Sequence, residues 1–336
     1  MKYIKYICIL GLCLYLIFSQ DRYTKFRAAL ETPNVVGLGW SGSGNHEPEK
    51  VIFWPSPDVR GAILSHINSA KTRVYLSVYM LTDETIIESI ALAHKRWVDT
   101  RVLLEPSVYN LPKVNQKAVN ILRKSWVTVL FSSEQVFNFN HSKYFVIDDR
   151  AMIATGNMTK SSLLINREVF AWYNSPDVVS SLVELFLADS QHIPVRSVWA
   201  GLLIAPLNTR SKLSEFINWA KIKLVLMSES FSDEGLTKLL LNARERGVSV
   251  EICVPQNRPI ESSILASLKS AGVIFSVALW PHVHAKTLLR DSTELFFGSA
   301  NFTANSLDNN REVSAFTEKQ EVILRYKKII ESDCKS

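Results

Sequence analysis

Hydrophobic and polar positions along the chain follow one order that occurs twice. A run rich in β-branched and aromatic residues precedes an Asp-Glu pair that signals a helix start, then a helical stretch and a second β-branched run. The first copy spans 71–104 and the second spans 221–254, at an offset of 150 residues, with the helix-start pairs at Asp83 and Asp233. Each copy predicts a βαβ unit, so we expect an α/β chain with two similar halves.

The N-terminus has a different pattern. A charge-free hydrophobic stretch of 13 residues runs from Tyr6 to Phe18, behind Lys2 and Lys5. It is short for a bilayer span, which needs about 20 residues, and is typical of a signal-peptide core or a short anchor. We therefore expect residues 1–20 to form an N-terminal signal or membrane anchor. The rest would lie on the non-cytoplasmic side, or be secreted if the segment is cleaved.

Chain length agrees with two halves. The 336 residues are about twice a typical domain of about 150 residues. Residues 21–49 hold four of the 12 glycines and are expected to form a linker. We expect the first lobe at 50–192 and the second lobe at 193–336.

The amino-acid composition is that of a globular protein. Hydrophobic residues make up 47% and charged residues 21%, which excludes a disordered chain and a membrane protein with many spans. The net charge of +6 suits an anionic partner, either phospholipid or nucleic acid. The four cysteines predict neither a disulfide framework nor a zinc site; they are Cys8, Cys13, Cys253 and Cys334.

A polar motif occurs once in each half. The pattern H-x-K-x4-D is followed by an Asn and then by a Glu, which lies 11 residues after that Asn in both copies. The first copy consists of His141, Lys143, Asp148, Asn157 and Glu168, and the second of His284, Lys286, Asp291, Asn301 and Glu312. Both Glu residues stand in the sequence Asn-Arg-Glu-Val. This repetition within strand-like sequence indicates a functional site.

The residue types of the motif indicate chemistry at phosphorus. In a strand, residues i and i+2 share a face, so each His projects with its Lys, whereas the Asp falls on the other face or beyond the strand. Two Lys and two Asn would surround a phosphoryl group with positive charge and hydrogen-bond donors. One neutral His would attack phosphorus and the other, protonated, would give its proton to the leaving alcohol. We expect no metal ion and no cofactor.

These residues resemble the HKD motif of the phospholipase D superfamily, in which G-S-x-N follows six residues after the Asp. The second copy matches in full through Gly298, Ser299 and Asn301, whereas the first has Ala154 and Thr155 and is one residue shorter. The resemblance covers roughly residues 50–320. It implies two similar α/β/α sandwich lobes related by a pseudo-twofold axis, the phospholipase D-like fold, with both motifs in one site of a single chain. We expect looser phosphate contacts in the first half.

The resemblance also assigns roles to the motif residues. It implies that His141 is the nucleophile and His284 the general acid. The phosphate-binding residues would be Lys143, Lys286, Asn157, Asn301 and Ser299. The supporting residues would be Asp148, Asp291, Glu168 and Glu312, and the two Glu would orient the histidines.

The implied function is metal-independent phosphodiester chemistry through a phosphohistidine. An anchored protein favours phospholipase D-type hydrolysis, or transfer of a phosphatidyl group, because the anchor raises the local lipid concentration. Two alternatives stay open: a membrane-tethered or secreted HKD endonuclease, and a catalytically silent protein that binds phosphate or lipid. A monomer is expected to suffice because one chain carries both motifs.

Two tryptophans stand where the repeat predicts glycine. Trp97 aligns with Gly247 and Trp126 with Gly272, each in a helix-to-strand connection that favours a left-handed residue. One hypothesis is that a codon read here as Trp is read as Gly in the source organism. The alternative is a genuine Trp exposed on the surface of a loop.

Overall fold

The computed structural model describes residues 46–55, 59–196, 201–256 and 260–334. The predicted N-terminal segment 1–20 and most of the predicted linker lie outside the described residues. Within the described part of the chain, none of the helices combines the length and the apolar character that a membrane span requires.

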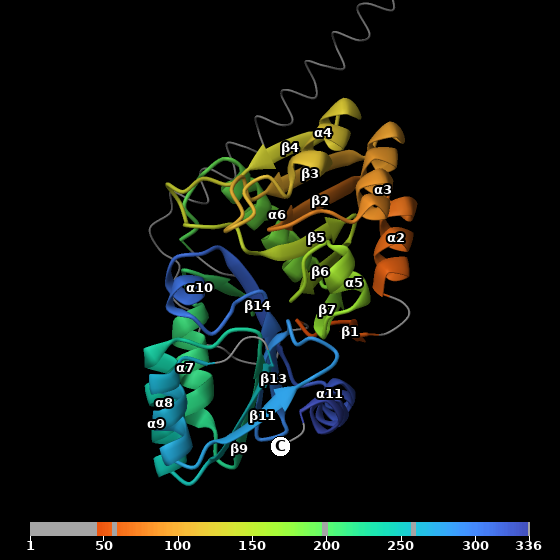
Figure 1. Cartoon of the computed structure of the whole chain (residues 1–336). Coiled ribbons are helices and arrows are strands. Elements are labelled where there is room, and N and C mark those ends of the chain that lie inside the picture. The colour runs from red at the N-terminus through yellow and green to blue at the C-terminus, as the bar shows by residue number, and fades with distance from the viewer. Residues whose placement is uncertain (1–45, 56–58, 197–200, 257–259, 335–336) are drawn as a thin grey trace, which may run out of the picture. The chain divides into compact units, whose positions relative to one another are not determined.

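Two seven-stranded mixed sheets form the framework, one in each half of the chain (Figure 1). The first has the order β1-β7-β6-β5-β2-β3-β4 and the second the order β11-β10-β9-β12-β13-β14-β8. The strands of the first sheet are β1 (Lys50–Trp54), β2 (Arg73–Val78), β3 (Asp99–Leu104), β4 (Thr128–Phe131), β5 (Lys143–Ile147), β6 (Arg150–Ala154) and β7 (Glu168–Tyr173). Those of the second are β8 (Leu203–Ala205), β9 (Lys223–Ser228), β10 (Ser249–Pro255), β11 (Ile274–Ala278), β12 (Lys286–Arg290), β13 (Glu294–Gly298) and β14 (Glu312–Thr317).

The helices cover both faces of each sheet. Helices α2, α3 and α4 lie side by side on one face of the first sheet, and α7, α8 and α9 cover the outer face of the second (Figure 1). Helices α6 and α11 contribute to a hydrophobic core that also contains strand residues of both sheets. The helices are α2 (Val59–Ser69), α3 (Glu84–Lys95), α4 (Gln116–Lys124), α5 (Lys160–Leu164), α6 (Pro176–Ser190), α7 (Thr209–Trp219), α8 (Glu234–Glu245), α9 (Ser262–Ser270), α10 (Ala304–Asp308) and α11 (Gln320–Asp333). This arrangement confirms the prediction of two similar α/β/α lobes.

Both predicted βαβ units are present. Strands β2 and β3 are parallel and flank α3 in sequence, and β9 and β10 are parallel and flank α8. The carboxylates of Asp83 and Asp233 cap these helices by accepting hydrogen bonds from the backbone N–H groups of Ile86 and Leu236. The motif strands β5 and β12 pair antiparallel with β2 and β9, so each motif lies beside the first strand of its βαβ unit.

Two buried ion pairs join the lobes in a crossed manner. Arg167 of the first Asn-Arg-Glu-Val sequence binds Asp333 at the end of α11, with Nε 2.6 Å from Oδ2. Arg311 of the second sequence binds Asp189 near the end of α6, with Nε 2.9 Å from Oδ2. Each guanidinium also donates to a backbone carbonyl, of Trp54 and of Ala205 respectively, so both are held on more than one side.

The two unexpected tryptophans occupy the predicted left-handed positions. Trp97 has φ 66° and Trp126 has φ 64°, and their counterparts Gly247 and Gly272 have φ 86° and 78°. The Trp side chains are 95% and 85% exposed, so neither is packed into the core. The backbone at these positions therefore has the conformation that favours glycine.

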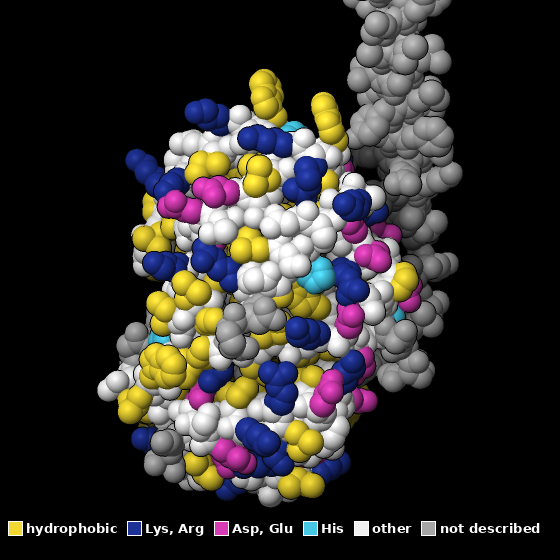
Figure 2. Space-filling model, turned by 90° about the vertical axis from the view of Figure 1, so that its right-hand side faces the viewer, with side chains coloured by type: hydrophobic (Ala, Val, Ile, Leu, Met, Phe, Trp, Pro, Cys, Tyr) yellow, Lys and Arg dark blue, Asp and Glu magenta, His cyan; other side chains and the backbone are white. Residues whose placement is uncertain are grey.

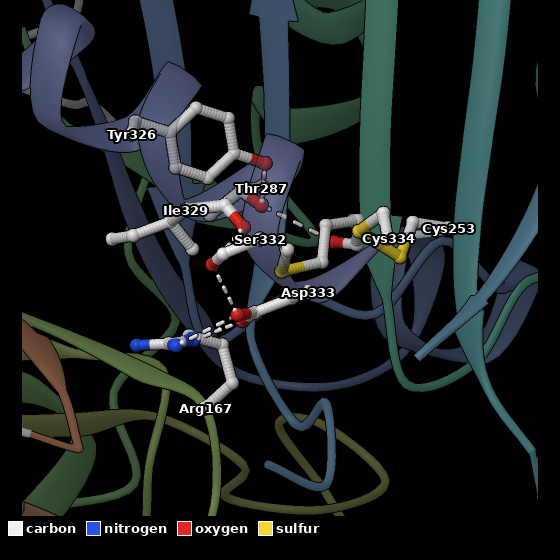
Figure 3. The surroundings of a disulfide bond; sticks show 9 residues. Arg167, Cys253, Thr287, Tyr326, Ile329, Ser332, Asp333 and Cys334 are labelled. Carbon is white, nitrogen blue, oxygen red and sulfur yellow. Dashed lines mark hydrogen bonds and ion pairs between the residues drawn. A yellow bond between two sulfur atoms is a disulfide. The ribbon is translucent and has the colours of Figure 1, made fainter. Parts of the chain in front are cut away.

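The structure contains a disulfide that the sequence analysis did not predict. Cys253 in β10 and Cys334 after α11 form a disulfide with a Cα–Cα distance of 5.8 Å, although the cysteines predicted no such framework (Figure 3). The two residues are 81 positions apart and meet only because the end of α11 packs near β10. Sequence spacing alone carries no signal for such a pair.

Candidate active site

The structure brings the two predicted histidines together from the two lobes. His141 lies just before β5, and its N–H donates to the carbonyl of Arg311 at 3.0 Å. His284 lies just before β12, and its N–H donates to the carbonyl of Arg167 at 3.2 Å. Each histidine segment thus pairs with the Asn-Arg-Glu-Val segment of the other lobe.

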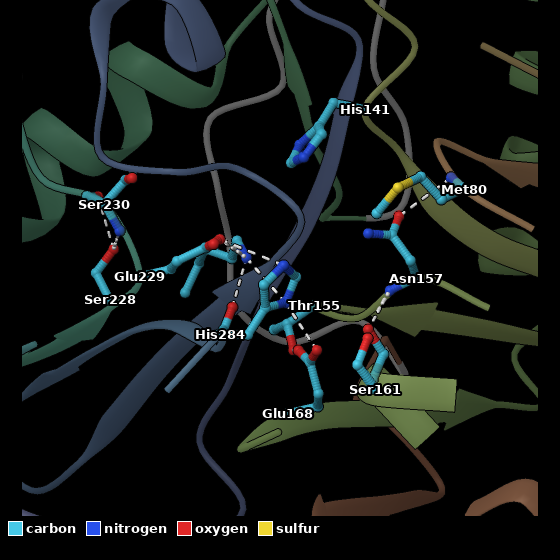
Figure 4. Close-up of polar contacts among 12 residues, drawn as sticks. Met80, His141, Thr155, Asn157, Ser161, Glu168, Ser228, Glu229, Ser230 and His284 are labelled. Carbon is cyan, nitrogen blue, oxygen red and sulfur yellow. Dashed lines mark hydrogen bonds and ion pairs between the residues drawn. The ribbon is translucent and has the colours of Figure 1, made fainter. Parts of the chain in front are cut away.

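The supporting glutamates are also crossed. His141 Nδ1 lies 2.9 Å from both carboxylate oxygens of Glu312, which belongs to the second lobe. His284 Nδ1 lies 2.7 Å from Oε1 of Glu168, which belongs to the first lobe (Figure 4). Both glutamate side chains are completely buried. A carboxylate at Nδ1 orients each imidazole and directs Nε2 away from that glutamate.

Two buried lysines lie beside the histidines. Lys143 Nζ donates to the carbonyl of His141 at 2.6 Å, and Lys286 Nζ donates to the carbonyl of His284. Both side chains are completely buried. Burial lowers the pKa of Lys143 to about 7; the nearby Glu312 opposes this shift and Lys286 adds to it.

Burial affects the other ionisable groups of the site in different ways. It lowers the pKa of His141, and the carboxylate of Glu312 offsets part of that effect. Burial alone would raise the pKa of Glu168, but the charges of His284 and Lys286 hold it below its usual value. Burial therefore favours the neutral form of His141, whereas Glu168 stays ionised.

The remaining predicted phosphate ligands differ in their contacts. Asn157 accepts a hydrogen bond from the N–H of Met80 at 3.3 Å, which fixes its amide plane. Asn301 has a buried amide oxygen with no hydrogen-bond partner in the described structure. Ser299 is completely buried, and its hydroxyl accepts a hydrogen bond from the N–H of Val313 at 2.9 Å. Ser299 therefore links the end of β13 to β14.

The irregular first motif keeps the same framework. The Thr155 hydroxyl accepts from the N–H of Val169 at 2.8 Å, as Ser299 does in the other lobe, and also donates to Glu168 Oε2 at 2.6 Å. The backbone of Gly156 approaches Glu168 so closely that an added Cβ would lie 2.7 Å from its Cδ. Thr155 and Gly156 thus make room for the buried carboxylate and hold it in place.

The two motif aspartates lie at the far ends of their strands. Asp148 accepts hydrogen bonds from the backbone N–H groups of Lys71, Thr72 and Arg73. Asp291 accepts from the three equivalent N–H groups at the start of β9, those of Lys221, Ile222 and Lys223. Burial would raise the pKa of each carboxyl, but these amides hold both pKa values below the usual range. Each aspartate fixes its motif strand to the neighbouring β-strand.

Two residues at the site were missed by the sequence analysis. The ring of Tyr79 packs edge-on against His141, with centroids 4.8 Å apart. Glu229 Oε2 lies 3.3 Å from His284 Nε2 and 3.2 Å from Lys286 Nζ. The two residues align with each other at the offset of 150, so the repeat contained the signal: a tyrosine and a glutamate in equivalent positions directly after the first strand of each unit.

The described residues contain no group of three or more His, Cys, Asp or Glu arranged to hold a metal ion. The positive groups next to the histidines are those of Lys143 and Lys286.

Comparison with known proteins identifies the family. A family model described as "Cardiolipin synthase, PLD-like domain" matches residues 63–190 and 213–334. The chain belongs to the phospholipase D superfamily. A cardiolipin synthase of Geobacillus kaustophilus is 29% identical over 194 residues, which cover 53% of this chain and 37% of that protein. One of Staphylococcus aureus is 26% identical over 230 residues, which cover 67% of this chain and 39% of that protein. The chain thus spans less than half the length of these relatives.

Solved structures with a similar fold cover most of the chain. The phosphatidylserine synthase of Haemophilus influenzae has a TM-score of 0.64 at 14% identity, covering 85% of this chain and 87% of that one. The polyphosphate kinase of Porphyromonas gingivalis has a TM-score of 0.68 at 16% identity, covering 84% of this chain and 49% of that one. At these identities the likeness shows the fold alone.

Proposed function

We propose that the protein is a phospholipid phosphodiesterase that cleaves the headgroup bond and passes the phosphatidyl group to water or to another alcohol. The observation that carries the proposal is the crossed pair of His–Glu contacts next to two buried lysines. The relatives named as cardiolipin synthases support a lipid substrate.

The residues divide the reaction between the two lobes. With Nδ1–H donated to Glu312, neutral His141 presents the Nε2 lone pair, which attacks phosphorus and forms a P–N bond. The P–O bond to the alcohol breaks, and His284 Nε2–H gives its proton to the leaving oxygen. In the second step His284 takes a proton from water or an acceptor alcohol, whose oxygen displaces His141. Lys143 and Lys286 stabilise the charge on the phosphoryl oxygens.

The surroundings of the site suit a lipid surface. The hydroxyl of Tyr79 accepts a hydrogen bond from the N–H of Tyr109, and Tyr109 is 71% exposed on the loop after β3. On the loop that leads to His284, Leu279 and Trp280 are 75% and 69% exposed. Aromatic side chains with a polar group, here Tyr109 and Trp280, favour the boundary between lipid and water. These exposed loops support a substrate at a lipid surface, and the anchor expected from the sequence would place that surface on the non-cytoplasmic side.

One face of the molecule carries no continuous basic stripe of the kind that binds a nucleic-acid backbone. On the face drawn in Figure 2, Lys and Arg side chains are interspersed with acidic and hydrophobic ones and form no continuous stripe. A groove that follows a nucleic-acid backbone requires such a stripe.

Substrate class is tested with purified protein, vesicles of phosphatidylglycerol or phosphatidylcholine, and single-stranded DNA, all in EDTA. We expect lipid cleavage that chelation leaves intact, because the lysines supply the charge stabilisation. DNA cleavage without lipid cleavage would establish the endonuclease instead. No turnover of either substrate would indicate a silent binding protein.

The division of labour is tested by comparing two histidine variants on two kinds of diester. His141→Ala should abolish turnover of natural and p-nitrophenyl diesters alike, because the nucleophile is lost. His284→Ala should still release p-nitrophenolate in a first-step burst and accumulate acid-labile phosphate on His141, because that leaving group needs no proton. Phosphate recovered on His284 of the wild-type enzyme would reverse the two roles.

A further inference from the structure

The pseudo-twofold symmetry of the site is broken at the equivalent positions Tyr79 and Glu229. In the first lobe Tyr79 places an uncharged ring against His141. In the second lobe Glu229 places a carboxylate against His284, and 16% of its side chain is exposed. The two sides of the phosphorus site therefore differ in charge although their backbones correspond.

Glu229 lies on the reacting side of His284. The Nδ1 of that imidazole faces Glu168 at 2.7 Å, whereas Glu229 Oε2 lies 3.3 Å from Nε2 (Figure 4). Nε2 is the nitrogen that exchanges a proton with the alcohol, so the alcohol oxygen and its neighbouring atoms must come next to Glu229. The same oxygen accepts a hydrogen bond from Lys286 at 3.2 Å.

A second acceptor lies in the same region. In the first lobe the amide oxygen of Asn157 accepts from the N–H of Met80. In the second lobe the equivalent N–H belongs to Ser230 and donates instead to the hydroxyl of Ser228, at 3.2 Å. The buried oxygen of Asn301 is left with no hydrogen-bond partner in the described structure. Asn301 adjoins Ser230 because the next residue of each, Phe302 and Phe231, pair in a β-bridge.

Acceptors of this kind oppose the binding of a phosphodiester unless the substrate offers donors to them. A carboxylate repels the anionic phosphate, and a buried oxygen without a partner is costly to leave unsatisfied. A hydroxyl or ammonium group next to the alcohol carbon would offset the negative charge of Glu229 and could donate to the Asn301 oxygen.

We propose that Glu229, assisted by Asn301, determines which alcohol the site accepts, selecting alcohols that carry a second hydrogen-bond donor. This inference rests on the proposed function. The donor is a neighbouring hydroxyl, as in a glycerol headgroup, or an ammonium, as in an ethanolamine headgroup. Both the leaving alcohol and the incoming alcohol use this place, because the second step reverses the first with a new alcohol.

The test compares cleavage of three lipids with equal acyl chains: phosphatidylglycerol, phosphatidylethanolamine and phosphatidylpropanol, which has no second donor. For the wild-type enzyme we expect kcat/KM to be at least about tenfold higher for one or both donor-bearing lipids than for phosphatidylpropanol. In Glu229→Gln and Glu229→Ala that ratio should fall toward about 1, mainly through loss on the donor-bearing lipid.

Two control variants separate selection from general damage. Tyr79→Phe alters the equivalent position on the nucleophile side, and Glu234→Gln removes an exposed carboxylate from the next helix. Both should keep the wild-type ratio whatever their absolute rates. A preference for glycerol alone or for ethanolamine alone would identify the donor.

Failure of this inference differs from failure of the proposed function. Cleavage with the same ratio in wild type and Glu229→Ala would overturn the role of Glu229 and leave the phosphodiesterase intact. Absence of cleavage of all three lipids would overturn both.

Discussion

Breaking the disulfide between Cys253 and Cys334 should destabilise the second lobe by a measurable amount. Cys334 is partly buried, so Cys334→Ser removes the cross-link while Cys253 stays in the core. The bond closes a loop of 81 residues. In the chain-entropy treatment, a loop of that size contributes about 4.5 kcal/mol at 25 °C, and losses on removing native disulfides are typically about 2–5 kcal/mol.

Urea unfolding measures this difference. With an m-value of about 3 kcal/mol/M, the expected loss lowers the unfolding midpoint by roughly 1 M. Reduced wild-type protein and Cys334→Ser should unfold together, and oxidised wild type should unfold later. Replacing Cys8 and Cys13 by Ser in all samples removes the other thiols, and peptide mapping without reductant should recover the linked Cys253 and Cys334 peptides.

The disulfide also lies close to a residue that fixes the site. Asp333 directly precedes Cys334 and binds Arg167, which directly precedes Glu168 (Figure 3). Arg167 also donates to the Trp54 carbonyl, a contact that does not involve the disulfide, so we expect the loss to appear in stability far more than in turnover below the unfolding transition. Coincident urea midpoints for oxidised, reduced and variant protein would refute the reasoning.

The buried lysine and the left-handed tryptophans give two more predictions. Because the pKa of Lys143 is about 7, its positive charge is lost as the pH rises above that value. The inhibition constant of diethyl phosphate should therefore rise by up to about tenfold per pH unit. Lys143→Arg should flatten this pH dependence, and an unchanged slope would exclude Lys143 as its cause. Trp97→Gly and Trp126→Gly should each stabilise the protein by about 0.5–1 kcal/mol in urea unfolding, whereas Gly247→Ala should destabilise it. A residue with a Cβ pays about 1–2 kcal/mol for the left-handed conformation. Glycine avoids that cost but loses about 0.5–1 kcal/mol more conformational entropy on folding, so the net gain is smaller. Mass spectrometry of the protein from its native source decides the recoding hypothesis, and a tryptophan mass at both positions would end it.

The sequence was sufficient for the features that repeat within the chain. The βαβ units follow from hydrophobic patterning around Asp83 and Asp233, and the left-handed connections follow from aligning Trp97 with Gly247. Such features depend on a few neighbouring residues, so local spacing encodes them.

Contacts between the two lobes could not be predicted from the sequence. Glu168 and Glu312 were predicted to orient histidines, but their crossing depends on how one lobe packs on the other. The disulfide of Cys253 depends on the same packing. Glu229 was visible in the alignment, yet only its 3.3 Å distance from His284 Nε2 shows that it belongs to the site.

The duplicated fold places two equivalent histidines in one site, and the residues around them differ. Two equivalent histidines would share one protonation state, whereas the proposed reaction needs one neutral and one protonated imidazole. Around His141 burial dominates and the neighbouring Tyr79 is uncharged, which favours the neutral base. His284 has carboxylates near both ring nitrogens, from Glu168 and Glu229, and the Lys286 ammonium lies 3.2 Å from its Nδ1. The two histidines therefore have unequal surroundings, and the proposed reaction, which needs one neutral and one protonated imidazole, requires such a difference.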